Sequence, residues 1–417
     1  MQNRSPNSKL IASSSYIMKW CVLAVIFAAP FSKSISEIAI SVGIAVLVLK
    51  KVTAKDMKLP KTGLEIPLII FLLTILPSFF NTQYPALSVK AMFTKVLKYV
   101  AFYYVIIDSI DTKSKLKDVF VIAVMSAVIV TLDGFAQHYY VCVDFLHAYP
   151  AFKVRGYWDS GGFFKGFPTS CFPFPNDLAA WLILVVLPIG CMALFGLKDL
   201  RTRLTAALVS ISMLGLLLMT KARGAWVGIG ASVFYVAVSK KKYWLIALLI
   251  IALAVPFIIK MEMAGYIFGT SSIGDRFFMW GTAWEILKNH PVIGNGLNTF
   301  FVNFMKYRND EWKGKKGSYA HNCYLQMACD VGVVGLSGFL WMIIAYFINV
   351  VRGIRRIKDS IYSSALLGIS MGALAFLIMG FFDTNLYSLN LVTLFWCAIG
   401  LSQAIVKIFR EEEGAAA

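Results

Sequence analysis

The chain has 417 residues, of which 59% are hydrophobic and 15% charged, and its formal net charge is +18. Its apolar residues form blocks long enough to cross a hydrocarbon core of about 30 Å, which requires about 20 residues in a helix, and this excludes an ordinary soluble domain. The basic residues fall mainly in short loops between these blocks, so the positive charge indicates membrane topology rather than nucleic-acid binding. We therefore predict an all-α, polytopic transmembrane helical bundle that forms a single integral membrane domain over residues 1–417.

About twelve apolar segments are expected to form its helices. No signal peptide of the usual form precedes them, so we expect the first segment to be retained as a helix. The segments cover residues 16–31, 34–49, 64–80, 92–109, 117–139, 176–196, 203–220, 224–239, 243–260, 322–350, 361–382 and 386–408.

Lysine and arginine residues alternate from loop to loop along this series. They gather near both chain ends and in every second loop, for example at Lys50, Lys115, Arg201 and Arg355. The loops between these contain almost no positive charge. By the positive-inside rule, both termini are expected to lie in the cytoplasm.

Two long loops then fall on the extracytoplasmic side, at residues 140–175 and 261–320. Their aromatic content predicts ordered structure with short helices, and residues 277–289 have the spacing of an amphipathic helix. Cys142 and Cys171 flank the first loop and could form a disulfide outside the cytoplasm, although free thiols are an equal alternative. The seven cysteines include no CxxC pair and no metal-ligand spacing. Neither a metal nor a cofactor is expected.

Polar residues interrupt the apolar segments where the expected helices begin on the extracytoplasmic side. Each has an ordinary explanation as a helix cap, a snorkelling side chain or a solvated charge. Their convergence on one membrane face favours a functional site instead. The residues are Asn176 and Asp177, Lys221 and Arg223, Arg276, His321 and Asn322, and Asp383 and Asn385.

The chemistry of these side chains suits a diphosphate substrate. Arg223 and Arg276 carry planar, permanently charged guanidinium groups that bind phosphate oxygens in pairs. His321 would lie near a helix N-terminus and two arginines, where its charged form is disfavoured, so we expect a neutral imidazole that can accept a proton.

Three stretches resemble the O-antigen ligase and polymerase superfamily. The first is KARGAW at Lys221–Trp226, and the second is DRFFMWGTAWEILKNHPVIGNGLNTF at Asp275–Phe300. The third is a His–Asn pair at His321, followed by glycines at Gly332 and Gly335. Together with the helical layout, these stretches extend the resemblance over most of the chain.

The resemblance implies a metal-independent glycosyltransferase in the bacterial inner membrane, with its active site at the periplasmic face. The enzyme would take a glycan from a polyprenyl diphosphate carrier and transfer it to the lipid A–core of lipopolysaccharide, with inversion. Arg223 and Arg276 would bind the diphosphate, and His321 would be the catalytic base. Asn322, Lys221, Asp383 and Arg155 are weaker supporting candidates; the Asp383–His321 pairing is our own inference, and Arg155 could equally be a loop charge near Asp159.

The local motifs do not separate a ligase from a polymerase, which would join carrier-linked repeat units. The larger, basic second loop favours an anionic acceptor and hence a ligase. A related transferase that modifies protein is a further alternative. A flippase or transporter would place charged residues near mid-membrane, whereas here they gather at one face. The sugars, the acceptor hydroxyl and the oligomeric state are not determined by the sequence.

Overall fold

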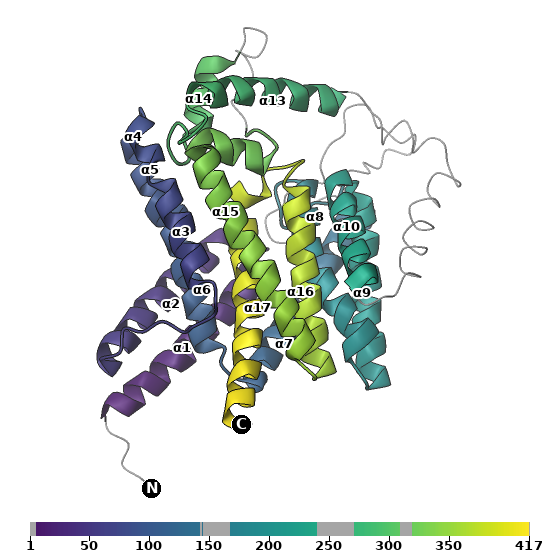
Figure 1. The fold of residues 1–417 in the computed structure, drawn as a ribbon. Helices are drawn as coiled ribbons and strands as arrows, with labels where there is room; N and C mark the ends of the chain where they lie inside the picture. The colour runs from purple at the N-terminus through teal and green to yellow at the C-terminus, as the bar shows by residue number, and fades with distance from the viewer. Residues whose placement is uncertain (1–5, 142–143, 145–166, 240–270, 309–318, 417) are drawn as a thin grey trace.

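The computed structural model describes residues 6–141, 144, 167–239, 271–308 and 319–416. Within these ranges the chain folds into helices joined by turns (Figure 1). The α-helices are α1 (Pro6–Ala28), α2 (Lys33–Ala54), α3 (Glu65–Ile75), α4 (Ser78–Asn81), α5 (Pro85–Ala91), α6 (Lys98–Ser109), α7 (Lys113–Ala136), α8 (Pro175–Cys191), α9 (Leu200–Thr220), α10 (Arg223–Ser239), α13 (Ser271–Asn289), α14 (Phe300–Tyr307), α15 (Cys323–Arg356), α16 (Ser360–Met379) and α17 (Leu389–Ala416). Short π- or 3₁₀-helical pieces are η1 (Met92–Leu97), η2 (Gln137–Val141), η3 (Met192–Gly196) and η5 (Asn385–Tyr387).

Seven helices in the described part of the chain are long and apolar enough to cross a membrane. The all-helical, multi-pass prediction is therefore confirmed, while the count of about twelve stays a prediction. The expected segment 243–260 lies outside the described residues, and segments 64–80 and 92–109 are each divided into shorter helical pieces. The seven spans are Lys9–Ala28, Lys113–Tyr139, Pro175–Gly196, Leu200–Thr220, Cys323–Arg356, Ser360–Met379 and Leu389–Gly414.

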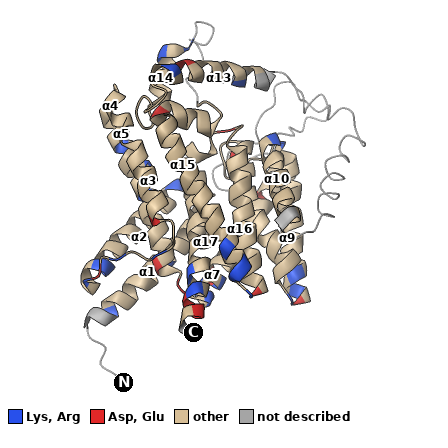
Figure 2. Ribbon diagram, in the orientation of Figure 1, with Lys and Arg blue, Asp and Glu red and all other residues tan. Residues whose placement is uncertain are grey.

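The bundle has two chemically different ends. Helix α1 begins and α17 ends at the same end, and basic side chains gather there on several helices (Figures 1 and 2). We call this the basic end. At the opposite end, which we call the site end, α13 lies across the bundle over α15 (Figure 1).

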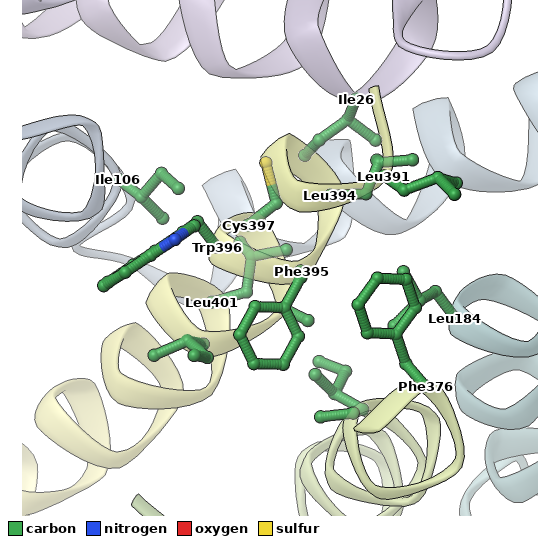
Figure 3. Packing of buried hydrophobic residues seen from close by; sticks show 14 of the residues in the cluster. Ile26, Ile106, Leu184, Phe376, Leu391, Leu394, Phe395, Trp396, Cys397 and Leu401 are labelled. Carbon is green, nitrogen blue, oxygen red and sulfur yellow. The ribbon is translucent and has the colours of Figure 1, made fainter. Parts of the chain in front are cut away.

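Close packing of the helices fixes the positions of the groups at the site end. α17 occupies a central position, with Ile106 of α6, Leu184 of α8 and Phe376 of α16 around it (Figure 3). α10 approaches α16 closely because Gly228 has no side chain: a Cβ there would lie 2.4 Å from the carbonyl oxygen of Ala375. Such small-residue contacts are how membrane helices gain tight van der Waals packing.

The predicted amphipathic helix at 277–289 is present within α13. Met279, Ala283 and Ile286 are buried against α14 and α15, whereas Phe277 and Trp284 are exposed. Because large exposed aromatics are costly in water but favourable at a lipid interface, this arrangement suits a helix at the membrane surface.

Candidate functional site

Helix α15 begins at the site end, directly after His321. Asn322 is its N-cap residue, and its side-chain oxygen accepts hydrogen bonds of 3.0 Å from two backbone N–H groups of the first turn. The backbone N–H of Cys323 donates to the carbonyl oxygen of Gly380 at 2.7 Å. The bond from Cys323 to Gly380 fixes the start of α15 to the end of α16. The Asn322 cap stabilises the start of α15 itself, typically by about 1 kcal/mol.

His321 has an unusual backbone conformation for a residue with a side chain. Its φ of 47° is in the left-handed region, which few residues other than glycine occupy. About a third of its side chain is exposed. Strained residues of this kind persist where the surrounding structure holds them and concentrate at functional sites.

Asp383, in the turn between α16 and α17, makes several polar contacts at the site end. Its Oδ1 lies 3.3 Å from Nδ1 of His321 and accepts a bond of 2.8 Å from the backbone N–H of Thr384. Its Oδ2 accepts a bond of 2.7 Å from the Asn176 amide, at the start of α8. One carboxylate therefore connects the starts of α8 and α15 to the α16–α17 turn.

The surroundings of Asp383 favour its ionised form. Burial alone would raise the pKa of this carboxyl, but the hydrogen bonds from His321 and Thr384 and the attraction to His321 and Arg276 outweigh burial. Its pKa is consequently lowered below the ordinary value of an aspartate. An ionised Asp383 can accept a hydrogen bond from a protonated Nδ1 of His321, which leaves Nε2 of the neutral ring free to accept a proton.

Arg223 and Arg276 are brought together although they come from separate parts of the chain. Arg223 is the first residue of α10, and a Cβ on the next residue, Gly224, would lie 3.3 Å from the Cβ of Phe382, the residue before Asp383. The charge of Arg276 interacts with those of Asp383 and Arg223. Burial lowers the pKa of Arg276, with Asp383 opposing this effect and Arg223 adding to it.

Two further charged residues border this group. Asp177, in the first turn of α8, interacts electrostatically with Asp383 and with Lys33, the first residue of α2. Lys221 is exposed, and its ammonium group lies 4.9 Å from the ring centroid of Phe167. Lys221 thus lies at the edge of the group, two residues before Arg223.

Within the second stretch, residues 291–296 form a Pro–x–x–Gly–x–Gly motif that has a structural role. α15 is interrupted at Gly332, which has φ 69° and ψ −178°, and the loop carrying the motif docks there. The N–H of Gly296 donates to the carbonyl of Asp330, and the N–H of Val333 donates to that of Pro291, at 2.8 and 2.9 Å. A Cβ on Gly332 would lie 2.2 Å from the carbonyl oxygen of Val292, so this close approach requires glycine.

Sequence reasoning did not single out two further residues, Asp330 and Trp280. Asp330 is buried, and its Oδ1 accepts bonds of 3.0 and 2.7 Å from the N–H groups of Thr299 and Phe300 at the start of α14. Trp280 is one turn from Arg276 on α13, and its buried indole nitrogen has no hydrogen-bond partner in the described part of the chain. An aspartate inside an apolar helix was the available signal for Asp330, while Trp280 was indistinguishable from the other aromatics of the loop.

Potential metal ligands gather elsewhere. Among the described residues, one group has ligand atoms within 4.8 Å of one another: Asp133, Asp144 and Cys171. Its carboxylate Asp133 Oδ2 already accepts a hydrogen bond of 2.5 Å from Ser170. Cys171 is a free, buried cysteine. Cys142, its possible disulfide partner, lies outside the described residues. The supporting site candidate Arg155 also lies outside them.

The arrangement combines two guanidinium groups with an imidazole aligned by a carboxylate. Guanidinium groups can hold a phosphate-bearing ligand, and an imidazole paired with a carboxylate can accept a proton from a hydroxyl. Of the residues expected at the site, the structure brings Arg223, Arg276, His321 and Asp383 together. The side chain of Asn322 caps α15, and its role as a supporting site residue stays a prediction.

Comparison with known protein families gives a match to the part of the chain that carries Arg223, Arg276 and His321. A family model described as O-antigen ligase matches residues 206–340, which include Arg223, Arg276 and His321. No curated protein matches the chain. The family match covers the part of the chain that carries the three motifs, and it confirms their resemblance to the O-antigen ligase superfamily.

Proposed function

We propose that the protein is a glycosyltransferase that moves a glycan from a polyprenyl diphosphate carrier to the lipid A–core of lipopolysaccharide. The observation that carries this proposal is the meeting of Arg223, Arg276, His321 and Asp383 at one end of a membrane bundle. We place this end at the periplasmic face, because the opposite end carries the basic loops and the positive-inside rule assigns those to the cytoplasm.

In this proposal the diphosphate binds to Arg223 and Arg276. The polyprenyl chain would remain in the lipid, so the phosphates must stay at the surface, where fixed cations compensate their charge. The two guanidinium groups would also stabilise the negative charge that develops on the leaving diphosphate.

The acceptor hydroxyl would then attack with the help of His321. Nε2 takes the hydroxyl proton as the oxygen forms its bond to the anomeric carbon, and the bond between that carbon and the diphosphate oxygen breaks. The diphosphate leaves with the electron pair, so direct displacement inverts the anomeric configuration. Asp383 would act as a positioning residue that accepts the Nδ1 proton in a hydrogen bond and stabilises the imidazolium that forms.

Purified protein with carrier-linked glycan and lipid A–core tests this proposal. His321→Asn is a suitable variant, because asparagine tolerates the left-handed backbone that His321 adopts but lacks the basic nitrogen. We expect it to lower turnover by about 100-fold or more, the usual size of a general-base effect. Asp383→Asn should lower turnover with donor affinity retained, and undiminished activity of His321→Asn would disprove the assignment of the base.

The donor assignment has its own test on helix α13. Arg276→Ala should weaken binding of the carrier-linked glycan by about tenfold or more, since a charged hydrogen bond is worth about 1.5–3 kcal/mol. Lys288→Ala is the matched control: this cation is on the same helix but is exposed and paired with Glu285. Equal donor affinity in the two variants would contradict the assignment. A carrier-linked repeat unit that serves as acceptor in place of lipid A–core would identify a polymerase.

A further inference from the structure

A large apolar groove lies in the half of the bundle toward the basic end. Its volume is about 760 Å³, within the range of about 300–1,000 Å³ typical of ligand sites. It is formed by α7, α8, α9, α16 and α17, and its lining is almost entirely hydrocarbon. Representative lining residues are Phe120, Val124, Val209, Ile369, Leu394 and Leu401. Figure 3 shows Leu394 of α17 near Ile26.

The depth of the groove corresponds to one membrane leaflet. On α7 its lining runs from Lys117 to Met125, and on α9 from Arg201 to Val209. At 1.5 Å per residue each stretch extends about 12 Å along its helix. Half of a hydrocarbon core of about 30 Å is about 15 Å, so the groove matches the acyl region of a single leaflet.

Two cations stand at the mouth of the groove. Lys117 and Arg201 both line it, both are exposed, and both lie within the first two turns of their helices at the basic end. Neither has a carboxylate partner among the residues that the structure describes. The acidic residues nearby in sequence are engaged elsewhere: Asp111 with Lys115, Asp118 with Lys19 and Asp199 with Thr202.

We propose that this groove binds an anionic phospholipid of the leaflet at the basic end. Its phosphate lies between Lys117 and Arg201, and an acyl chain fills the apolar part. A free phosphate would gain nothing from the hydrocarbon lining, whereas a phospholipid matches both the charge and the depth. The site is distinct from the His321 and Asp383 group, which lies at the other end of the bundle.

Native mass spectrometry can measure this binding directly. The full-length protein is reconstituted in vesicles of equal parts phosphatidylglycerol and phosphatidylethanolamine, extracted, and weighed with its retained lipid. We expect phosphatidylglycerol to be retained preferentially. The double variant Lys117→Ala with Arg201→Ala should reduce its retention by about 25-fold, since each cation near a membrane surface contributes about fivefold.

Matched variants separate the site from general surface charge. Lys198→Ala with Arg203→Ala removes two exposed cations from the same end that do not line the groove, and it should leave retention unchanged. Ala206→Phe fills the groove while keeping both cations, and it should lower retention. Equal retention of the two lipids, or equal loss in both double variants, would overturn the proposal. Displacement of the lipid by a polyprenyl phosphate would assign the groove to the carrier instead and equally overturn it.

Discussion

At the scale of single residues, Asp383 connects groups that are far apart in the sequence. It contacts His321 and Asn176 through different oxygens and interacts with the charge of Arg276. A partly buried carboxylate with these partners is stabilised in its ionised form, and its removal leaves several donors without an acceptor. Asp383 therefore contributes to stability as well as to the orientation of His321.

This contribution predicts a specific dependence of stability on pH. The pKa of Asp383 is lower in the folded protein than in the unfolded chain, so the folded state gains stability above the unfolded pKa of about 4. That stability is lost as the pH falls through the lower, folded pKa. Asp383→Asn should therefore lower the melting temperature at pH 7, and its difference from the unchanged protein should shrink below about pH 4. Thermal unfolding of both proteins in detergent between about pH 3 and pH 7 measures this difference in melting temperature. A difference that grows on acidification would contradict an ionised Asp383.

At the scale of elements, the contact between the loop at residues 291–296 and the break in α15 at Gly332 holds α13 and α14 in place at the site end. The loop replaces backbone bonds that the helix loses at Gly332, since Val333 and Val334 donate to carbonyl groups of Pro291 and Val292. Asp330 then caps α14 from the same stretch of α15. Because α13 precedes this loop directly, the contact also determines where Arg276 lies relative to His321.

Two glycine substitutions test this element. Gly332→Ala places a Cβ against the Val292 carbonyl at a positive φ, and we expect it to destabilise the protein by about 1–3 kcal/mol. Gly281→Ala is the control, because a Cβ there on α13 meets nothing within 4 Å and should stabilise the helix by about 0.5–1 kcal/mol. Denaturation in detergent compares the two, and equal stability of both variants would contradict the proposed role of the contact.

At the scale of the whole molecule, charge and site occupy opposite ends of the bundle. The cationic helix ends lie with the end of α17, and α13 lies across the other end (Figures 1 and 2). Moving a strongly charged loop across the bilayer is unfavourable, so this separation predicts one orientation in the membrane.

Thiol labelling in intact spheroplasts tests this orientation. The six cysteines in the described part of the chain are buried, so a Cys142→Ser background should label weakly with an impermeant maleimide. Lys288→Cys on α13 should then react from outside, whereas Lys198→Cys, an exposed position at the basic end, should react only after lysis. Reaction of Lys198→Cys in intact cells would reverse the assigned sides.

Much of the fold and part of the site could be predicted from the sequence. Long apolar blocks determine helices that must satisfy their own backbone hydrogen bonds in lipid, which is why α8, α9, α15, α16 and α17 lie close to the predicted segments. Residue type also identified Arg223, Arg276 and His321 as candidates. The divisions within segments 64–80 and 92–109, and α14, were not foreseen, because short helical pieces depend on local contacts rather than on hydropathy.

The sequence by itself determined the membrane class, the helical architecture and the side-chain chemistry available at the helix starts, because hydropathy and charge act locally along the chain. Only the tertiary structure decided which of those starts meet. Asn176, Arg223, Arg276, His321 and Asp383 come from five separate segments, and their approach depends on small-residue packing at Gly224 and Gly228 and on the loop seated at Gly332. Contacts of this range are set by packing between helices, which no local pattern in the sequence encodes.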